Sequence, residues 1–503
     1  MTANARHLCL SLAAMSFGLV ALSNYSTTVV AQSGPTVFDT NLAVRTVVSG
    51  LSQPTSMAFL AADDFLVLEK PTGQVKHVVN GAVTGVALDL AVNNNSERGL
   101  LGIALHPSFA TNHFVYLYWT CTAPVPANPM FPSADECPNQ PATGADSGNV
   151  LAVPLLGNRV DRFVWNGSTL AFDRNLIKLR SFQNDQTNGT PRGNHNGGVI
   201  RFGPDGKLYI IIGDNGRRGQ LQNLENGPFG PGQPDDQFGG PQPDRAHFTG
   251  VIIRLDDDGA APADNPFFEA GGRMGGEAGA NVQKIFAYGV RNSFGLAFDP
   301  LSGNLWDQQN GDDSFDELNR VEAGANLGWI QVMGPASRVA QFKEIETTPP
   351  FVGLQQARWP PSNIADTPAE ALSRLFMLPG ARYSDPEFSW KFAVAPAGIG
   401  FLNSRALGPQ YRGDLFVGAA RPTLDNGYLF HFNLTGNRRK IGVDDPRLED
   451  RVADNAAKFD PTESESLRFG SGFGIGTDIQ TGPNGNLFVV SLSNGSVYEI
   501  FRR

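Results

Sequence analysis

One short pattern of apolar residues recurs six times along the chain. The pattern consists of an apolar triplet, a turn with Pro or Gly, and a second short apolar run. Such a phrase is typical of a β-hairpin, in which a turn joins two antiparallel strands. We expect a hairpin with a tight Gly turn at each copy, at 57–68, 102–118, 199–212, 295–306, 398–417 and 481–490.

Six such phrases predict an all-β fold, a six-bladed β-propeller built from antiparallel sheets around one axis. A blade alone would leave an apolar face exposed, and its neighbours in a closed ring would cover that face. The alternative is a β-sandwich with repeated turns, although sandwiches do not usually repeat one phrase six times. Aperiodic segments between the phrases predict long top-face loops at 120–148, 217–248 and 335–390.

The start of the chain predicts an export signal. A positive first segment precedes a mostly apolar run over 8–22 that is too short to span a bilayer. Val29 and Ala31 have the small side chains that an export peptidase reads. We therefore expect a signal peptide over 1–31, although a disordered tail is the alternative. One propeller domain over 32–503 would follow, in a periplasmic or secreted protein with no membrane span.

Cysteine use and charge narrow the possible partners. Cys9 lies in the signal segment, so Cys121 and Cys137 remain as a pair in an oxidising compartment and predict one disulfide. The formal net charge of −10 argues against a nucleic-acid partner and is compatible with a small neutral molecule. No haem-attachment motif is present in the sequence, so electrons would leave through a diffusible acceptor.

One histidine stands apart from the others. His195 lies in a Gly- and Asn-rich segment just before the third phrase, whereas His77 and His431 lie in phrases without polar clusters. Asp214 ends the next apolar run, so a hairpin would place it beside His195. A carboxylate beside an imidazole fixes the tautomer and raises the basicity that a general base needs. The alternative is a loop histidine that caps a turn.

Two further constellations carry polar groups. Arg291 and Asn292 directly precede the fourth phrase, where a guanidinium could polarise a carbonyl or hold an anion. It could equally pair with a carboxylate of a neighbouring blade. The acidic segment 310–319 could bind Ca²⁺ through carboxylates and backbone carbonyls, or it could be a solvated loop.

In this order, these constellations resemble the glucose/sorbosone dehydrogenase family, soluble sugar dehydrogenases that use pyrroloquinoline quinone (PQQ). The resemblance implies a six-bladed propeller that carries PQQ and Ca²⁺ on its top face. The matching stretches are 97–107, 195–216, 250–255, 264–267, 288–300, 316–319 and 326–329.

The resemblance also implies a role for each site residue. His195 would take the proton from the anomeric hydroxyl of an aldose while a hydride passes to PQQ. Asp214 would orient this base, and Arg291 would stabilise the negative charge that develops on the quinone oxygen. The implied cofactor contacts are Glu97, Asn292 and Arg421, and the implied Ca²⁺ ligands are the backbone carbonyls of Gly311 and Asp312.

The sequence departs from the family at the expected cofactor site. Ile475 and Thr477 stand where PQQ binders of the family commonly carry two Arg. Asp312 stands where the family usually has Pro. PQQ has three carboxylates, so the loss of two guanidiniums removes strong charge-assisted hydrogen bonds.

Together these features predict an exported oxidoreductase that oxidises aldoses or related alcohols with PQQ. Two alternatives remain. A non-catalytic propeller that binds a ligand or a partner is favoured by the missing Arg pair. A Ca²⁺-dependent lactonase-type hydrolase would need a ring of carboxylates on the axis, which the sequence does not reveal. The sequence names neither the sugar nor the oligomeric state.

Overall fold

The computed structural model describes residues 34–123, 136–144, 152–181, 193–216, 249–349, 364–420 and 426–503. The predicted signal peptide, the predicted loop 217–248 and Arg421 therefore lie outside the described residues. Residues Pro35–Arg503 form one unit, and the strands below all belong to it. No helix of the described ranges has the length and apolar character needed to cross a membrane.

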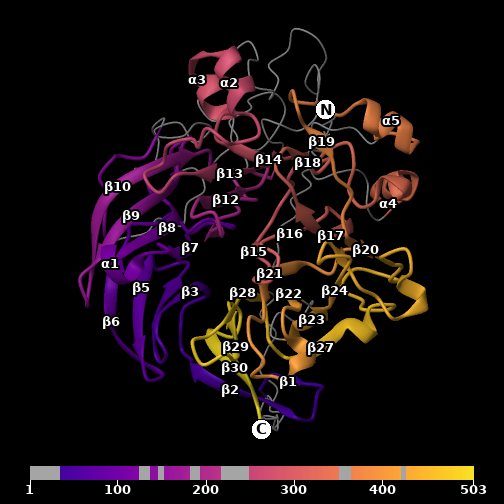
Figure 1. Ribbon diagram of the computed structural model, residues 1–503. Helices are drawn as coiled ribbons and strands as arrows, with labels where there is room; N and C mark the ends of the chain where they lie inside the picture. The colour runs from indigo at the N-terminus through magenta and orange to yellow at the C-terminus, as the bar shows by residue number, and fades with distance from the viewer. Residues whose placement is uncertain are drawn as a thin grey trace, which may run out of the picture. The chain divides into compact units, whose positions relative to one another are not determined.

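The described strands form six sheets of four to six strands and one two-stranded sheet (Figure 1). Two sheets use strands that follow one another in the chain. The first contains β3 (Pro54–Ala61), β4 (Asp64–Glu69), β5 (Gln74–Val79) and β6 (Ala82–Asp89). The second contains β7 (Leu100–Leu105), β8 (Phe114–Thr120), β9 (Asn158–Trp165) and β10 (Leu170–Leu179).

Two further sheets add short outer strands from later in the chain. One contains β11 (Ile200–Phe202), β12 (Leu208–Ile212), β13 (Val251–Leu255), β14 (Ile285–Tyr288), β18 (Ala325–Asn326) and β19 (Arg382–Tyr383). The other contains β15 (Gly295–Phe298), β16 (Leu305–Gln309), β17 (Ser314–Val321), β20 (Phe388–Phe392) and β26 (Val452–Ala453).

The last two large sheets each contain a strand from the beginning of the unit. One contains β21 (Pro396–Phe401), β22 (Leu415–Ala419), β23 (Tyr428–Phe432), β27 (Arg468–Ser471) and β1 (Thr36–Val37). The other contains β28 (Gly476–Thr481), β29 (Leu487–Ser491), β30 (Ser496–Arg502) and β2 (Leu42–Val48). The two-stranded sheet pairs β24 (Leu434–Thr435) with β25 (Lys440–Ile441).

Each repeated phrase of the sequence forms the first two strands of a different sheet. These strands pair antiparallel in all six cases, so the prediction of one hairpin per phrase is confirmed. The prediction of a tight Gly turn is wrong for three of them. The turn between β3 and β4, at Ala62 and Asp63, contains no Gly. Helix α1 (Phe109–Asn112) lies between β7 and β8, and the 3₁₀ helix η3 (Pro409–Tyr411) lies between β21 and β22.

The first strands of the six sheets face a common centre (Figure 1). They contact one another in the cyclic order β3, β7, β11, β15, β21, β28 and back to β3. Strand β2 pairs antiparallel with β30, so the beginning and the end of the unit complete one sheet. This closure leaves the inner strands with neighbours on both sides. The all-β propeller class predicted from the phrases is therefore confirmed.

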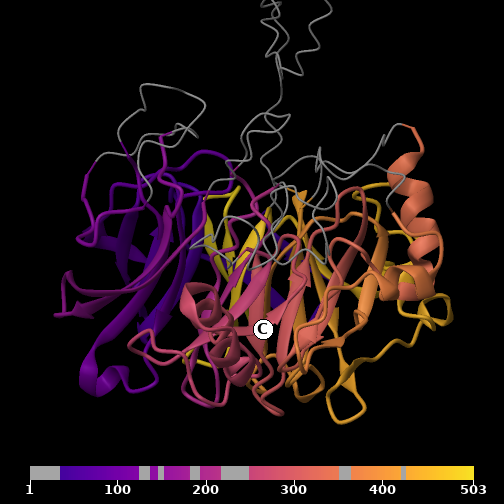
Figure 2. The ribbon, with the colours of Figure 1, turned by 90° about the horizontal axis from the view of Figure 1, so that it is seen from above.

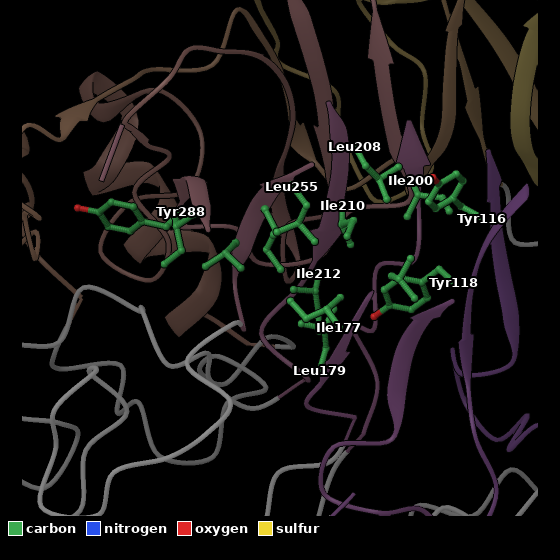
Figure 3. Close-up of a cluster of buried hydrophobic side chains, with 14 of the residues drawn as sticks. Tyr116, Tyr118, Ile177, Leu179, Ile200, Leu208, Ile210, Ile212, Leu255 and Tyr288 are labelled. Atoms are coloured by element: carbon green, nitrogen blue, oxygen red, sulfur yellow. The ribbon is translucent and has the colours of Figure 1, made fainter. Parts of the chain in front are cut away.

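Apolar side chains fill the space between adjacent sheets. Figure 3 shows one such cluster, in which Tyr116 of β8 lies beside Ile200 of β11. Leu208, Ile210 and Ile212 of β12 alternate along the strand and belong to the same buried cluster. Because alternate side chains of a strand share one face, each sheet presents an apolar face to its neighbour. Burial of such faces supplies the main favourable free energy of the fold.

The described residues of segment 335–390 do not form the loop that its aperiodic sequence predicted. It contains η1 (Ala336–Arg338), α4 (Val339–Thr347) and α5 (Pro368–Ser373), which lie outside the strands in Figures 1 and 2. Phe342 and Ile345 of α4 pack in one buried cluster with Trp329. Apolar contacts with this cluster, which also contains Phe315 of β17, therefore stabilise the helix. The remaining helices are α2 (Phe268–Met274), α3 (Gly276–Val282), η5 (Pro446–Leu448) and η6 (Glu465–Leu467).

The predicted disulfide is present. The sulfur atoms of Cys121 and Cys137 are 2.04 Å apart, and the bridge closes a loop with a sequence separation of 16 residues. Both cysteines are buried in an apolar cluster with Trp119 and Val92. The bridge therefore attaches the segment after β8 to the core of the second sheet.

Removal of this bridge should destabilise the protein without changing its fold. We expect the Cys121→Ser/Cys137→Ser variant to lose about 3 kcal/mol of unfolding free energy, because the open loop has more conformations in the unfolded chain. Urea-induced unfolding measures this loss. The reduced wild type should behave as the variant does, and equal stability of the oxidised wild type and the variant would contradict the expectation.

Candidate functional site

The inner hairpin β11–β12 brings a histidine and an aspartate together. His195 lies just before β11, and Asp214 lies just after β12, which pairs antiparallel with β11. Nδ1 of His195 lies 2.6 Å from Oδ1 of Asp214, and both side chains are buried. The pairing expected from the sequence is therefore present in the structure.

Asp214 is held by several donors besides the imidazole. Its Oδ2 accepts a hydrogen bond of 2.9 Å from Nε1 of Trp329, and its Oδ1 accepts one of 2.7 Å from the Gly216 amide. Burial acts to raise the pKa of Asp214, but the charge and hydrogen bond of His195, with Arg291, bring it below its ordinary value. An ionised Asp214 only accepts, so Nδ1 of His195 donates to it, and in the neutral imidazole Nε2 is the nitrogen that carries the lone pair.

The backbone at the site is tightly constrained. His195 has a φ of 56° and Asn215 a φ of 57°, in the left-handed region that side chains with a Cβ rarely adopt. A Cβ on Gly213 would lie 2.4 Å from the Arg291 carbonyl oxygen and 2.8 Å from that of His195. Only glycine therefore permits these three segments to approach one another here.

Arg291 joins this pair to the next sheet. Its carbonyl oxygen accepts a 2.9 Å hydrogen bond from the Asp214 amide. Its guanidinium donates to Asp312 Oδ1 and to the Asn310 carbonyl, each at 2.8 Å, and lies 5.3 Å from the centre of the Trp329 ring. Arg291 is thus in the expected cluster and also in an ion pair. Its partner Asp312 lies between β16 and β17, in the sheet that Arg291 directly precedes, and not in a neighbouring blade as the alternative had it.

Two of the expected cofactor contacts lie close to the histidine and arginine. Glu97 Oε2 accepts a 2.5 Å hydrogen bond from the His195 backbone amide. Asn292 is buried, and its Oδ1 has no hydrogen-bond partner in the described part of the chain. The side-chain amide of buried Asn215 also has no partner there. Buried polar atoms without partners indicate a place for a polar ligand or for water.

A cavity of about 240 Å³ lies where the inner strands begin. We call it the upper cavity. It is lined by Thr55, Ser56, Lys70, Ser96, Glu97, Leu101, Gly102, Gly197, Val199, Arg201, Phe294, Ala397, Ile475, Thr477 and Leu492. The positions that replace the family's two Arg therefore do line a cavity next to His195. A second cavity of about 770 Å³, the lower cavity, is lined by the other ends of the same strands, among them Phe59 and Phe401.

A histidine–aspartate pair alone does not define the site. His77 pairs with Asp64 and His431 with Asp414, each at 2.7 Å, which corrects the expectation that these histidines lack polar neighbours. Their side chains are 16% and 25% exposed, against 5% for His195. Burial, Trp329 and the neighbouring upper cavity distinguish the pair of His195.

The expected calcium ligands have an unexpected neighbour. The Asp312 carbonyl oxygen accepts a hydrogen bond of 3.4 Å from Nζ of Lys458, and the same ammonium pairs with Asp313. The Asp312 carboxylate is bound by Arg291, and the described residues contain no group of three metal-ligating side chains. An ammonium beside this carbonyl opposes a divalent cation, so the residues as arranged do not fit Ca²⁺. Calcium at Gly311 and Asp312 stays a prediction.

The upper cavity does fit a flat polar cofactor such as PQQ. Ile475, Leu492 and Phe294 supply apolar walls, and Lys70 supplies a positive charge. Oδ1 of Asn292 and the side-chain amide of Asn215, which have no partner among the described residues, lie in the segments that hold Arg291 and Asp214. Apolar walls with a few placed polar groups are typical of cofactor sites.

Some residues of the site were missed in the sequence. Trp329 lies in a stretch that resembles the family, yet nothing in the sequence showed that its indole would donate to Asp214. Lys458 lies far along the chain from Asp312, in no recognised motif. Lys70 follows β4 directly, and only the assembled inner strands show that it lines the upper cavity.

These observations define an all-β propeller with a buried imidazole–carboxylate pair beside a cavity between its inner strands. A model of the Glucose / Sorbosone dehydrogenase family matches residues 51–366. This match covers more than half of the chain, which therefore belongs to the glucose/sorbosone dehydrogenase family.

Named relatives agree with this assignment. The chain is 24% identical over 460 residues to an aldose sugar dehydrogenase of Escherichia coli, with 90% of this chain and 91% of that protein covered. It is 28% identical over 303 residues to quinoprotein glucose dehydrogenase B of Acinetobacter calcoaceticus, with 58% and 53% covered. These names support an oxidoreductase that acts on sugars.

A solved structure shares the fold. The PQQ-bound form of an aldose sugar dehydrogenase from Streptomyces coelicolor aligns with a TM-score of 0.54 and 21% identity. The alignment covers 92% of this chain and 98% of that one. At this identity the likeness shows the fold alone.

The ion pair between Arg291 and Asp312 should be essential for stability. Arg291→Met would leave a buried carboxylate without its guanidinium, and we expect a loss of about 3–5 kcal/mol in unfolding free energy. Arg291→Met/Asp312→Asn should recover part of this loss, because the uncompensated charge is gone. Urea unfolding of the two single variants and the double variant gives the coupling. Additive effects would contradict the pairing.

Proposed function

We propose that this protein is an exported PQQ-dependent dehydrogenase that oxidises the anomeric hydroxyl of aldoses or related alcohols. The observation that carries the proposal is the buried His195–Asp214 pair beside the upper cavity. Membership of the sugar dehydrogenase family supports the reaction class. The six sheets and the cyclic contacts of their inner strands support a six-bladed ring.

His195 would act as the general base. The hydrogen bond of Nδ1 to Asp214 leaves Nε2 as the acceptor, and Nε2 makes no hydrogen bond in the described part of the chain. A sugar hydroxyl within hydrogen-bond reach of Nε2 could pass its proton to the imidazole. Asp214 holds the ring in the required tautomer and stabilises the imidazolium that forms.

Arg291 would stabilise negative charge that develops in the reaction, and Trp329 would hold the orientation of Asp214. Arg291 is fixed by Asp312 and by the Asn310 carbonyl, so its positive charge has a defined position beside the pair. A fixed guanidinium stabilises negative charge that develops nearby during the reaction. Trp329 donates to the second oxygen of Asp214 and so prevents the carboxylate from rotating away from the imidazole.

Asn292, Glu97 and Thr477 would provide polar contacts to the cofactor, and Ile475 an apolar wall. PQQ, when bound, supplies the two-electron acceptor that the side chains lack. The family resemblance extends the contacts to Arg421, which lies outside the described residues. Electrons would then pass to a diffusible acceptor. Export to the periplasm or to the medium is part of the proposal, and the disulfide between Cys121 and Cys137 supports an oxidising compartment.

Reconstitution tests the proposed function. Purified protein is mixed with PQQ, with and without Ca²⁺, and dye reduction is measured with a panel of aldoses. Uptake of PQQ together with turnover of at least one aldose is the expected result. No uptake and no turnover in either buffer would reject the proposal.

His195→Gln should lower kcat by about 10²–10⁴-fold and leave the affinity for PQQ unchanged, because only the base is lost. Steady-state dye reduction and a PQQ titration measure the two effects. His431→Gln is the matched control, since it removes another imidazole that pairs with an aspartate, Asp414, and that lies outside the upper cavity. Equal activity of His195→Gln and the wild type would exclude His195 as the base.

A non-catalytic binding propeller remains the second candidate, and one observation favours it. Ile475 and Thr477 line the upper cavity without any positive charge. This candidate predicts that a ligand raises the melting temperature although no sugar is oxidised. Thermal unfolding with PQQ, read beside the dye assay, separates the two candidates.

A further inference from the structure

One cationic residue of the upper cavity makes no ion pair within the described residues. Its charged lining residues are Lys70, Glu97 and Arg201. The guanidinium of Arg201 pairs with Asp478 at 2.6 Å, and Glu97 accepts a hydrogen bond from the His195 backbone amide. Nζ of Lys70 donates to the Asn94 carbonyl at 3.0 Å and makes no ion pair in the described part of the chain. An ammonium has three donors, so two remain for a ligand.

A second cation, Arg98, follows the lining residue Glu97 and lies close enough to Lys70 for its charge to act on that ammonium. Arg98 is fully buried, and its guanidinium donates to Asn93 Oδ1 and to the Gly193 carbonyl. Its Nη2 has no hydrogen-bond partner among the described residues, and it forms no ion pair there. Lys70 and Arg98 therefore bring two positive charges to this side of the upper cavity, where Glu97 supplies one negative charge.

The excess charge has an energetic consequence. Burial lowers the pKa of Lys70 to about 8, although the charge of Glu97 acts in the opposite direction. Burial likewise lowers the pKa of Arg98, to about 10. The folded protein thus holds positive charge where it is partly removed from water, which is unfavourable unless an anion compensates it. A bound anion in the upper cavity would supply this compensation.

We propose that Lys70 is the cationic anchor of the upper cavity and pairs with a carboxylate of the bound cofactor. The inference rests on the proposed function, in which that cofactor is PQQ. Ile475 and Thr477 leave their side of the cavity without charge, whereas Lys70 places an ammonium on the wall formed by β4 and the segment before β7. The cavity keeps a positive site for an anionic ligand, at a different position from the family's Arg pair.

Equilibrium dialysis with PQQ tests the inference without any need for turnover. Lys70→Met should weaken PQQ binding by about 10- to 100-fold, because one charge-assisted hydrogen bond is lost. Lys70→Arg keeps the charge and should bind within a few-fold of the wild type. Thermal unfolding of both variants shows whether each is folded.

Two additional variants sharpen the test. Lys284 is another lysine whose pKa is lowered by burial, and it does not line the upper cavity. Lys284→Met should therefore leave the affinity for PQQ unchanged. The addition of Ile475→Arg and Thr477→Arg to Lys70→Met should restore binding, since positive charge returns to the cavity.

The outcomes separate this inference from the proposed function. If the wild type binds PQQ and Lys70→Met binds it equally well, Lys70 is not the anchor of the cofactor, and the dehydrogenase proposal stands. If the wild type takes up no PQQ, the proposed function itself is rejected. Equal losses of affinity in Lys70→Met and Lys284→Met would also overturn the anchor, because the effect would then follow from removing any buried lysine.

Discussion

The site depends on one buried carboxylate. Asp214 binds the His195 ring with one oxygen and the Trp329 indole with the other, and its backbone amide donates to the Arg291 carbonyl. The three partners come from three different parts of the chain, so this single side chain fixes their positions relative to one another. Because Asp214 is fully buried, its charge is stable only while these donors remain in place.

The closed ring is what brings these segments together. Inner strands of neighbouring sheets lie side by side, so residues just before β7, β11, β15 and β28 all meet at the same end. Glu97, His195, Arg291 and Ile475 are such residues. The pairing of β2 with β30 joins the two ends of the unit and completes this arrangement.

Local repeats made much of this architecture predictable. The apolar phrases identified all six inner hairpins, and the positions of His195 and Asp214 at the two ends of one hairpin predicted their contact. The helices α4 and α5 were not predicted, because the segment that contains them lacks a clear apolar periodicity. Thr367 caps α5 and Pro368 begins it, a helix-start signal that the sequence did contain.

Contacts between distant segments could not be predicted in this way. Lys458 and Asp312 are separated by 146 positions, and no pattern relates them. The pairs of His77 and His431 with aspartates were missed for the same reason. Asp64 lies on the strand next to that of His77, Asp414 directly precedes the strand next to that of His431, and the sequence does not specify the register of these strands. Charge in the cavity is likewise a property of the assembled ring.

The central claim is that the upper cavity, with Lys70 on one wall and His195 beside it, is where cofactor and sugar react. A crystal structure of the protein grown with PQQ tests this claim most directly. We predict cofactor density in the upper cavity, with a carboxylate within hydrogen-bond distance of Lys70 Nζ and with room for a sugar hydroxyl at His195 Nε2. Density in the lower cavity, or in the upper cavity with its carboxylates away from Lys70, would contradict it.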